Sequence, residues 1–410
     1  MTTTPKKILL AFSGGLDTSA IIPWLKDTYN NPEVIAYCAD LGNAPDGVYL
    51  EKWAKELGAS SFIFEDLKDR FASEFAFVAV RAGATYQDDY LLGTALGRPL
   101  ISERMAFFAK KLGCDAIAHG ATGKGNDQLR FEKSWAYLAP EIEVIAPWKK
   151  WDFKGRKELI NYLATKNIHF ENTEKFFSVD VNLFHRSCEG GVLENITQEY
   201  DLNAVYSWVA TPEKSLKDSI TVNITFKNGL PQSVNGKDLT PAALLTELNQ
   251  IAGAAGIGVL DLVEERTIGL KSRGVYETPG GTLLHLACRN LKHLTWDREL
   301  LSVARTLAIS YGEAIYDGHW HSPTRLAAEA FFKEASKTLN GEITLKLQGG
   351  QARVISRVSN YALYDEAGVS FEIDKLQMHK HAHGYSKTVC YGPWKAGQRD
   401  AKNGLGFELK

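Results

Sequence analysis

The fold that we expect is decided by the stretch Lys7-Ile-Leu-Leu-Ala-Phe-Ser-Gly-Gly-Leu-Asp-Thr-Ser19 near the start of the chain. It begins with a short apolar run, which predicts a strand buried on both faces. Residues 20–26 are also mostly apolar and predict a helix. The loop between them therefore opens a helix, where unpaired backbone N–H groups and the positive end of the helix dipole favour an anion.

The loop at residues 13–19 has a composition suited to phosphate groups. Its two glycines allow positive φ and let the oxygens of a ligand approach the backbone closely, and its hydroxyl side chains add donors. Asp17 stands out because a bare carboxylate repels phosphate, and a divalent metal ion between the two would resolve this conflict. Taken alone, the loop is equally well explained as a tight strand–helix turn capped by a serine.

The order of residues in this loop separates it from other phosphate-binding loops. It is shorter than the G-x-x-x-x-G-K-[ST] loop of kinases and GTPases and has no lysine. It resembles the S-G-G-x-D-[ST] loop of the ATP pyrophosphatase superfamily, which binds the pyrophosphate end of ATP and transfers AMP to a substrate oxygen. That superfamily has several chemistries, so other segments must decide among them.

Length and composition limit the class of protein. A chain of 410 residues predicts two domains and a tail, and a formal net charge of −2 gives no basic surface for nucleic acid. The sequence has no apolar run long enough to span a membrane and no signal-peptide core at its start, so we expect no membrane partner and a cytoplasmic location. The 5 cysteines are far apart and predict reduced thiols.

Strands and helices alternate over residues 1–168. Beyond the first strand, the pattern predicts strands at 34–39, 61–64, 116–119 and 144–146, and helices at 49–57, 101–112 and 155–166. Such alternation predicts an α/β fold with a doubly wound parallel sheet. Ligands bind such sheets beyond the carboxyl ends of the strands, where the loops 13–19, 40–43 and 120–130 lie.

The pattern changes in residues 169–370, which predict a second, α+β domain. Asn228-Gly229 and Gly349-Gly350 mark two hairpins, and Thr240-Pro241 starts a helix that runs to Ala255. Residues 371–410 are expected to form a less regular C-terminal tail. Its histidines at 379, 381 and 383 are better explained as solvated than as metal ligands, because no cysteine or carboxylate cluster accompanies them.

The loop Gly120-Ala-Thr-Gly-Lys-Gly-Asn-Asp-Gln-Leu-Arg130 carries a second set of polar side chains. Its glycines suit a ligand that is pressed against the backbone. Thr122, Asn126, Asp127 and Arg130 offer a hydroxyl, an amide, a carboxylate and a guanidinium, which fit a zwitterionic ligand. A flexible surface loop is the alternative, but the position at a strand end favours a ligand site.

Several segments, in this order, resemble argininosuccinate synthase over residues 8 to about 373. They are the loop at 13–19, Y-L-L-G-T-A-L-x-R-P at 90–99, H-G-A-T-G-K-G-N-D-Q-x-R at 119–130, G-L-K-S-R-G-V-Y-E-T-P-G at 269–280 and Y-x-G-x-W-x-S-P at 316–323. The last segment lies near subunit contacts in that family. The resemblance implies a fold like that of the adenine nucleotide alpha hydrolases, and a homotetramer.

The family joins citrulline and aspartate with ATP, and gives argininosuccinate, AMP and pyrophosphate through a citrullyl-AMP intermediate. The resemblance therefore implies ATP contacts at Ala11, Phe12, Ser13, Gly14, Gly15, Leu16, Asp17, Thr18, Ser19, Ala39 and Gly120. Citrulline contacts are implied at Tyr90, Thr94, Asn126, Arg130, Ser178, Ser187, Glu264 and Tyr276, and aspartate contacts at Thr122, Asn126 and Asp127.

The implied catalytic residues are Asp17, Asp127 and Arg130. Mg²⁺ would arrive with ATP and lie near Asp17, and no metal site of the protein's own is implied. The sequence offers no obvious general base other than the two aspartates, and Asp17 is the better candidate for the metal. Phe12 departs from the family pattern, because a tyrosine is usual at that position.

The loop is also compatible with two other functions. The protein could be another enzyme of the same superfamily, or a sensor that binds ATP without turnover. A glutamine-dependent amidotransferase needs a nucleophilic cysteine, usually at the mature N-terminus, but the first cysteine here is Cys38. A tRNA thiolase needs a reactive cysteine pair and a basic face, and the sequence predicts neither. A degenerate sensor is not indicated, because the acidic, amide and basic side chains of both loops are present.

Overall fold

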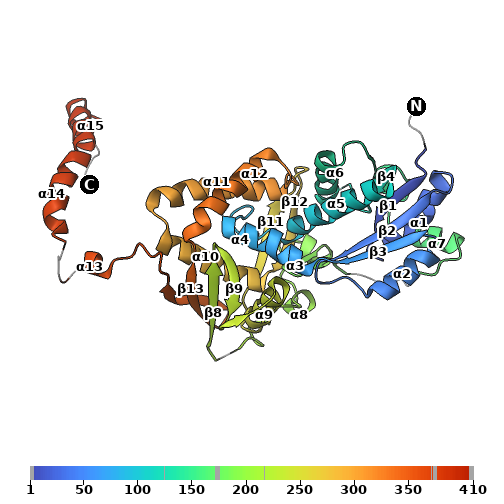
Figure 1. Cartoon of the computed structure of the whole chain (residues 1–410), viewed down its shortest axis with the longest axis horizontal. Coiled ribbons are helices and arrows are strands. Elements are labelled where there is room, and N and C mark those ends of the chain that lie inside the picture. The colour runs from blue at the N-terminus through green and yellow to red at the C-terminus, as the bar shows by residue number, and fades with distance from the viewer. Residues whose placement is uncertain are drawn as a thin grey trace. The chain divides into compact units, whose positions relative to one another are not determined.

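The computed structural model describes residues 4–123, 125–170, 176–216, 218–370, 372 and 376–405. The chain forms two compact units, Met1–Ala362 and Leu363–Lys410 (Figure 1). The described residues of the first unit form three sheets, one parallel and two antiparallel. Lys124, in the glycine-rich loop, lies outside the described residues.

The parallel sheet has the strand order β3-β2-β1-β4-β5. Its strands are β1 (Lys7–Ala11), β2 (Glu33–Asp40), β3 (Ser61–Asp66), β4 (Ala116–Ala118) and β5 (Glu143–Ile145). The chain grows outward from β1 in one direction through β2 and β3, and then in the other through β4 and β5. Because this reversal separates the loops that follow β1 and β4, it opens the crevice in which such sheets bind ligands.

Helices cover both faces of the parallel sheet, as the alternation of side chains along β1 requires. Ile8 and Leu10 pack in one core with α1 (Leu16–Thr28), α2 (Gly47–Glu56) and α7 (Arg156–Thr165). Leu9 points to the other core, with α5 (Gly93–Leu112) and α6 (Asp127–Leu138). The expected α/β fold with a doubly wound parallel sheet is therefore confirmed.

The larger antiparallel sheet has the order β10-β9-β8-β13-β14. Its strands are β8 (Ile220–Lys227), β9 (Leu230–Val234), β10 (Lys237–Asp238), β13 (Gly341–Gln348) and β14 (Gln351–Val358). Both predicted hairpins, β8–β9 and β13–β14, are confirmed. The predicted helix after Thr240 is α9 (Pro241–Ala254), and the Thr240 hydroxyl accepts a hydrogen bond from Ala243 N.

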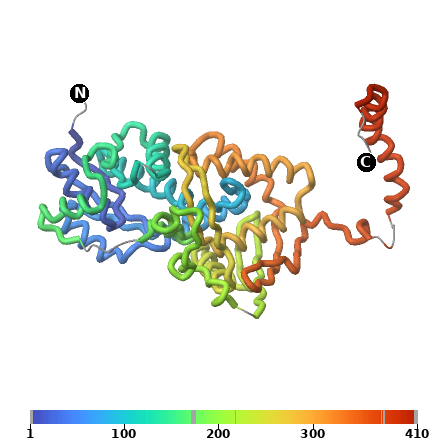
Figure 2. The backbone as a smooth tube through the Cα atoms, turned by 180° about the vertical axis from the view of Figure 1, so that it is seen from behind, coloured from blue at the N-terminus to red at the C-terminus, as the bar shows by residue number. Residues whose placement is uncertain are grey.

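The smaller antiparallel sheet has the order β11-β12-β7-β6. Its strands are β6 (Ser178–Asn182), β7 (His185–Glu189), β11 (Val259–Glu265) and β12 (Lys271–Glu277). Figure 2 shows the β11–β12 hairpin, in yellow, where the parallel-sheet region meets the rest of the first unit. This sheet therefore brings side chains of the second half of the chain to the edge of the first half.

The main core of the first unit is built largely by helices. It joins α4 (Phe77–Ala82) and the first half of α5 to α10 (Pro279–Thr295), α11 (Arg298–Tyr316) and α12 (Pro323–Ala335), together with α9 and the inner face of the larger antiparallel sheet. α10 was not expected from the sequence. No helix in the described ranges is long and apolar enough to cross a bilayer.

Two expected helix boundaries were wrong. The helix expected to start at residue 101 begins at Gly93, and residues 127–130, expected as loop, form the first turn of α6. Gly93 resembles a loop residue in the sequence, but its role is close packing, because a Cβ there would lie 2.0 Å from His185 Cβ. Tertiary packing overrides local preference at this position.

The second unit is more regular than expected. Its described residues contain α13 (Glu366–Val369), α14 (Met378–Val389) and α15 (Tyr391–Lys402), so the expectation of an irregular tail was wrong. The side chains of both longer helices are almost all exposed, and their helical form rests on local hydrogen bonds rather than a core. Among the described residues, no group of three or more His, Cys, Asp or Glu side chains is placed to hold a metal ion, and this includes the histidines of α14.

Candidate active site

Two cavities meet beyond the carboxyl ends of the parallel strands. The first, of about 580 Å³, lies over β1, β2 and β4, and we call it the nucleotide cavity. The second, of about 690 Å³, lies between the start of α6 and the smaller antiparallel sheet, and we call it the amino-acid cavity. Both cavities lie at the edge of the sheet where the sequence predicted ligand binding.

Most residues expected to contact ATP line the nucleotide cavity. These are Ala11, Phe12, Ser13, Gly15, Asp17, Thr18, Ala39 and Gly120. The remaining three do not line it. Leu16 is buried in the core beneath the loop, Gly14 makes the turn, and Ser19 is completely buried. The loop therefore offers residues 13, 15, 17 and 18 to the cavity and uses the others to hold its own shape.

The shape of the loop depends on Gly14 and Ser19. Gly14 has a φ of +74°, which favours glycine, and a Cβ there would lie 2.6 Å from Leu50 Cδ2. Ser19 Oγ accepts a hydrogen bond of 2.9 Å from Trp53 Nε1 and donates one of 3.4 Å to Gly14 O. Ser19 thus stabilises the loop from below, and its hydroxyl is engaged there rather than in the cavity.

A buried histidine holds the second loop, which follows β4. His119 Nδ1 accepts a hydrogen bond of 3.1 Å from Ala121 N, so the proton of the neutral ring lies on Nε2. Nε2 lies 3.4 Å from Glu132 Oε1, and Lys149 Nζ lies 2.6 Å from the same oxygen. Sequence reasoning did not assign His119, although it opens the H-G-A-T-G segment.

Every residue expected to contact citrulline or aspartate lines the amino-acid cavity. The set comprises Tyr90, Thr94, Thr122, Asn126, Asp127, Arg130, Ser178, Ser187, Glu264 and Tyr276. They come from the turn before α5 and the start of α5, the loop and first turn of α6, and all four strands of the smaller sheet. Ser187 and Tyr276 are direct partners in the register of β7 and β12.

Glu264 presents an acceptor without a partner to this cavity. Its Oε1 accepts a hydrogen bond of 3.1 Å from the Tyr276 hydroxyl. Its Oε2 is buried and makes no hydrogen bond with any described residue. Burial raises the pKa of Glu264, and the nearby Arg130 opposes this. A buried carboxylate oxygen without a donor is costly, so the cavity favours a ligand with an N–H group here.

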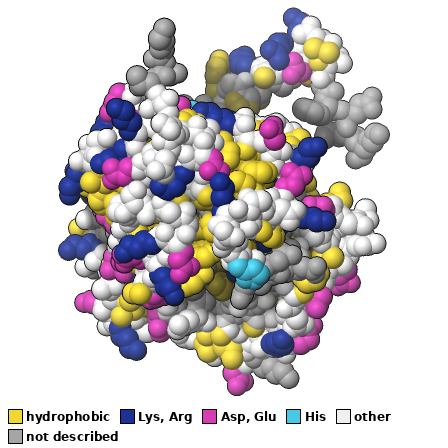
Figure 3. Space-filling model, turned by 90° about the vertical axis from the view of Figure 1, so that its right-hand side faces the viewer, with side chains coloured by type: hydrophobic (Ala, Val, Ile, Leu, Met, Phe, Trp, Pro, Cys, Tyr) yellow, Lys and Arg dark blue, Asp and Glu magenta, His cyan; other side chains and the backbone are white. Residues whose placement is uncertain are grey.

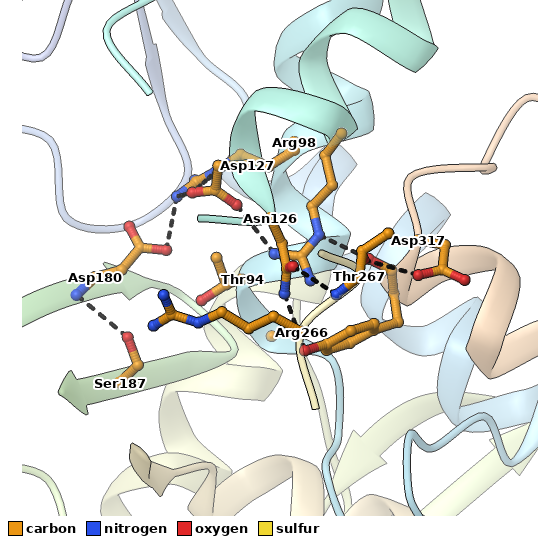
Figure 4. Close-up of polar contacts among 12 residues, drawn as sticks. Thr94, Arg98, Asn126, Asp127, Asp180, Ser187, Arg266, Thr267 and Asp317 are labelled. Atoms are coloured by element: carbon orange, nitrogen blue, oxygen red, sulfur yellow. Dashed lines mark hydrogen bonds and ion pairs between the residues drawn. The ribbon is translucent and has the colours of Figure 1, made fainter. Parts of the chain in front are cut away.

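The two cavities share a wall made by Asp127 and Asp180. Arg98 joins these carboxylates, because its Nη2 lies 2.7 Å from Asp127 Oδ2 and 2.9 Å from Asp180 Oδ2 (Figure 4). Arg130 Nη1 lies 3.0 Å from the other oxygen of Asp127. Burial acts to raise the pKa of Asp127, but the two arginines outweigh it and hold the pKa below its usual range.

A distant segment positions Asn126 and Arg130. The hydroxyl of Tyr316 accepts a hydrogen bond of 2.9 Å from Asn126 Nδ2, and its carbonyl accepts one of 2.8 Å from Arg130 Nε. Thr267 N donates to Asn126 Oδ1 at 3.0 Å. Tyr316 is completely buried. The sequence placed Tyr316 in a segment near subunit contacts and did not assign it to the site.

His185 supports the opposite side of the cavity. Its Nε2 lies 3.2 Å from Thr94 Oγ1, and its ring stacks on Tyr276 at 5.5 Å between centroids. Burial lowers the pKa of His185 to about 4, so the ring is neutral at pH 7. Sequence reasoning missed it, and its only signal was its place between Ser178 and Ser187.

Charged side chains of both signs are interspersed on the face of the molecule shown in Figure 3. This agrees with the formal net charge of −2. A mixed surface of this kind gives no electrostatic attraction for a polyanion on that face.

Fold and site together define an enzyme of the nucleotide-binding α/β class that brings a nucleotide beside a polar small molecule. Residues 7–169 match the family model described as the arginosuccinate synthase N-terminal HUP domain. Residues 177–391 match the model for the arginosuccinate synthase C-terminal domain. The chain belongs to the argininosuccinate synthase family, which confirms the resemblance found in the sequence.

Curated relatives agree with this assignment. An argininosuccinate synthase of Caldanaerobacter subterraneus subsp. tengcongensis is 45% identical over 381 residues, which cover 93% of this chain and 92% of that protein. One of Roseiflexus sp. (strain RS-1) is 44% identical over 388 residues, covering 94% and 95%. One of Desulfitobacterium hafniense (strain DSM 10664 / DCB-2) is 45% identical over 381 residues, covering 93% and 94%.

Proposed function

We propose that this chain catalyses the reaction for which its family is named, the ATP-dependent ligation of citrulline and aspartate to argininosuccinate, with release of AMP and pyrophosphate. One observation carries the proposal: the nucleotide cavity and the amino-acid cavity share the wall formed by Asp127 and Asp180. A shared wall brings the α-phosphorus of ATP and the ureido group of citrulline to one place, as adenylation requires.

In the first step, the ureido oxygen of citrulline attacks the α-phosphorus of ATP. A new P–O bond forms, the bond to the β-phosphate oxygen breaks, and pyrophosphate leaves from the loop at 13–19. Glu264 Oε2 accepts a hydrogen bond from citrulline, and Ser178 and Ser187 line the same cavity. Most of the rate enhancement comes from positioning and from neutralising charge on the phosphates.

Asp17 is the residue that would hold Mg²⁺ brought by ATP. Its carboxylate lines the nucleotide cavity beside the hydroxyls of Ser13 and Thr18, so the donors there are hard oxygens of the kind Mg²⁺ prefers. The ion, when bound, would offset the negative charge of the phosphates. Asp17 therefore acts in ATP binding and has no part in proton transfer.

In the second step, the amine of aspartate attacks the activated ureido carbon, loses a proton, and displaces AMP together with the ureido oxygen. Asp127 pairs with the ammonium of aspartate before it loses its proton, and Thr122 and Asn126 bind its carboxylates. Arg130 offsets the charge of Asp127 and of the leaving AMP. Arg98 keeps the Asp127 carboxylate at the wall between the cavities.

The products test the proposal. With ATP, citrulline and aspartate, the protein should form AMP and pyrophosphate in equal amounts, because its loop lacks the lysine that serves γ-phosphoryl transfer. Omission of citrulline should abolish both products. Release of ADP that depends on citrulline would reject the assignment.

We also propose that the chain works as a homotetramer in the cytoplasm. The exposed aromatic side chains Tyr385, Tyr391 and Trp394 of the second unit support assembly, because large exposed apolar groups are typical of contact surfaces. Light scattering of the full chain should give about four times the mass of one chain, and a monomeric mass would contradict the proposal.

A further inference from the structure

A third cavity adjoins the amino-acid cavity, with which it shares the side chains of Tyr90 and Tyr276. Its volume is about 680 Å³, and it is bounded by α10, α11, the start of β11 and the turn at residues 85–91. We call it the rear cavity. It lies within the first unit, and the proposed reaction makes no use of it.

Two polar atoms in the rear cavity lack hydrogen-bond partners, and a buried cation beside them lacks a counter-ion among the described residues. His285 Nε2 and Trp296 Nε1 are buried and make no hydrogen bond with any described residue. Lys292 is 9% exposed, and its Nζ lies 5.2 Å from the centre of the Trp296 ring and has no ion-pair partner in the described part of the chain. Buried polar groups without partners are rare, and together they indicate a missing ligand.

The charge of the lining indicates which ligand fits. Arg289 and Arg305 line the cavity on the side of Lys292. The nearby carboxylate of Glu329 is already paired with Arg81, and Arg325 Nη1 lies 3.8 Å from it. Asp88 and Asp89 line the cavity from the turn at residues 85–91, and no ion pair joins them to Lys292, Arg289 or Arg305 in the described part of the chain. An anionic group therefore fits against α10, where positive charge is uncompensated.

The rear cavity and the amino-acid cavity share two aromatic side chains. Tyr90 and Tyr276 line both, with ring centroids 4.6 Å apart. The backbone around Tyr90 has three residues other than glycine at positive φ, Gln87 at 47° and Asp88 at 71° before it and Leu92 at 67° after it. Such backbone is strained, and strain of this kind marks segments that can change conformation.

We propose that the rear cavity is a second binding site, which takes a small molecule with a carboxylate or phosphate group between Lys292, Arg289 and His285. Its occupancy fixes Tyr90 and Tyr276 and so changes the affinity for the substrate in the amino-acid cavity. Binding at this site is independent of the proposed reaction, and only the kinetic consequence rests on it.

Thermal unfolding of the full chain tests binding directly. Sodium phosphate and sodium citrate, each compared with sodium chloride at equal ionic strength, represent the two sources of the anionic group. At least one should raise Tm in a saturable way. Lys292→Met should raise the Tm of the free protein, because it removes a buried charge that has no ion-pair partner among the described residues, and should abolish the response to the anion.

Arg289→Gln is the second variant, because Arg289 is exposed and its loss should leave the fold intact. It should weaken the apparent affinity for the anion by about tenfold, whereas Lys333→Gln, an exposed change on α12, should leave it unchanged. A response that is absent with both anions, or that is unchanged in Lys292→Met and Arg289→Gln, would overturn the site.

A separate measurement tests whether anion binding in the rear cavity changes substrate affinity in the amino-acid cavity. The saturating anion should change KM for citrulline at least about twofold in the native protein and not in Arg289→Gln. An unchanged KM with a normal Tm response would overturn the coupling and keep the site. A normal Tm response in a protein that forms no AMP would reject the proposed reaction instead.

Discussion

The nucleotide cavity and the amino-acid cavity share a wall but are built in different ways. The nucleotide cavity is formed mainly by short loops that directly follow β1, β2 and β4. The amino-acid cavity takes side chains from α5, α6 and four antiparallel strands, over residues 90–276. The nucleotide cavity is therefore formed by residues close together in the sequence. The amino-acid cavity forms only when segments far apart in the sequence pack together.

We expect the two cavities to hold their ligands by different means. The first offers backbone at glycines and the start of α1, so few single side chains should matter there. The second uses side chains that are held by other side chains, such as Asn126 by Tyr316 and Thr94 by His185. Single substitutions should therefore affect one cavity and spare the other.

The largest effect of a substitution on activity is expected at Asp17. Its carboxylate is a side-chain group in a cavity where we expect most other contacts to come from the backbone. Asp17→Asn should lower kcat/KM for ATP by about a hundredfold and leave citrulline binding unchanged, because the carboxylate is proposed to act through Mg²⁺. A Mg²⁺ titration of turnover measures this. Asp152→Asn, an exposed change, is the control. Unchanged turnover across the titration would remove Asp17 from the site.

Asp127 tests the shared wall. Asp127→Asn should lower kcat/KM for aspartate by about ten- to a hundredfold, since one charge-assisted hydrogen bond contributes roughly 1.5–3 kcal/mol. Pyrophosphate release in a single turnover with citrulline and without aspartate should survive.

Asp180→Asn is the matched control for Asp127, because it also contacts Arg98 but is not among the expected aspartate contacts. It should spare the use of aspartate. If both half-reactions fell together in Asp127→Asn, the residue would serve to hold the arginines rather than to bind aspartate.

His185 provides a further test on the side of the amino-acid cavity, through the pH dependence of stability. Its pKa of about 4 lies below the ordinary value of 6.5, so the unfolded chain binds a proton between these values and the folded chain does not. The stability that neutral His185 contributes is therefore complete above pH 6.5 and lost as the pH falls toward 4. At pH 5 the loss is about 2 kcal/mol.

His185→Asn should remove this part of the pH dependence. Thermal unfolding from pH 7 to pH 4 measures it, and the variant should show a shallower fall in Tm than the native protein. Equal slopes would mean that the ring is not held neutral in the folded state.

The smallest effect is expected at Phe12 in the nucleotide cavity. Phe12 is 3% exposed and packs edge-to-face on Phe62 at 6.4 Å between centroids. Phe12→Tyr restores the hydroxyl that is usual in the family and should change KM for ATP by less than about threefold, because backbone groups dominate this cavity. A change above tenfold would contradict the contrast drawn between the cavities.

The sequence alone predicted the features of the fold that depend on residues close together in the chain. The loop at 13–19 follows a buried strand and opens a helix, and strand alternation places it at the ligand-binding edge of the sheet. The two hairpins were predicted because Asn228-Gly229 and Gly349-Gly350 specify turns. The residues of the amino-acid cavity were available only through the resemblance to a family.

The features of the site and fold that the sequence did not predict depend on contacts between residues far apart in the chain. Arg98 meets Asp180 across 82 positions, and Tyr316 meets Asn126 across 190. No local pattern marks such pairs. The start of α5 was misplaced for the same reason, since Gly93 is required by its packing against His185 and not by a turn.

The hydrogen bond from Trp53 Nε1 to Ser19 Oγ has an optical consequence. The indole of Trp53 is partly buried under the loop that is proposed to receive pyrophosphate, and its emission depends on the strength of that hydrogen bond. Entry of a nucleotide that tightens or displaces the loop should therefore shift the fluorescence of Trp53, one of the 9 tryptophans of the chain. Such a shift would report nucleotide binding without an added dye.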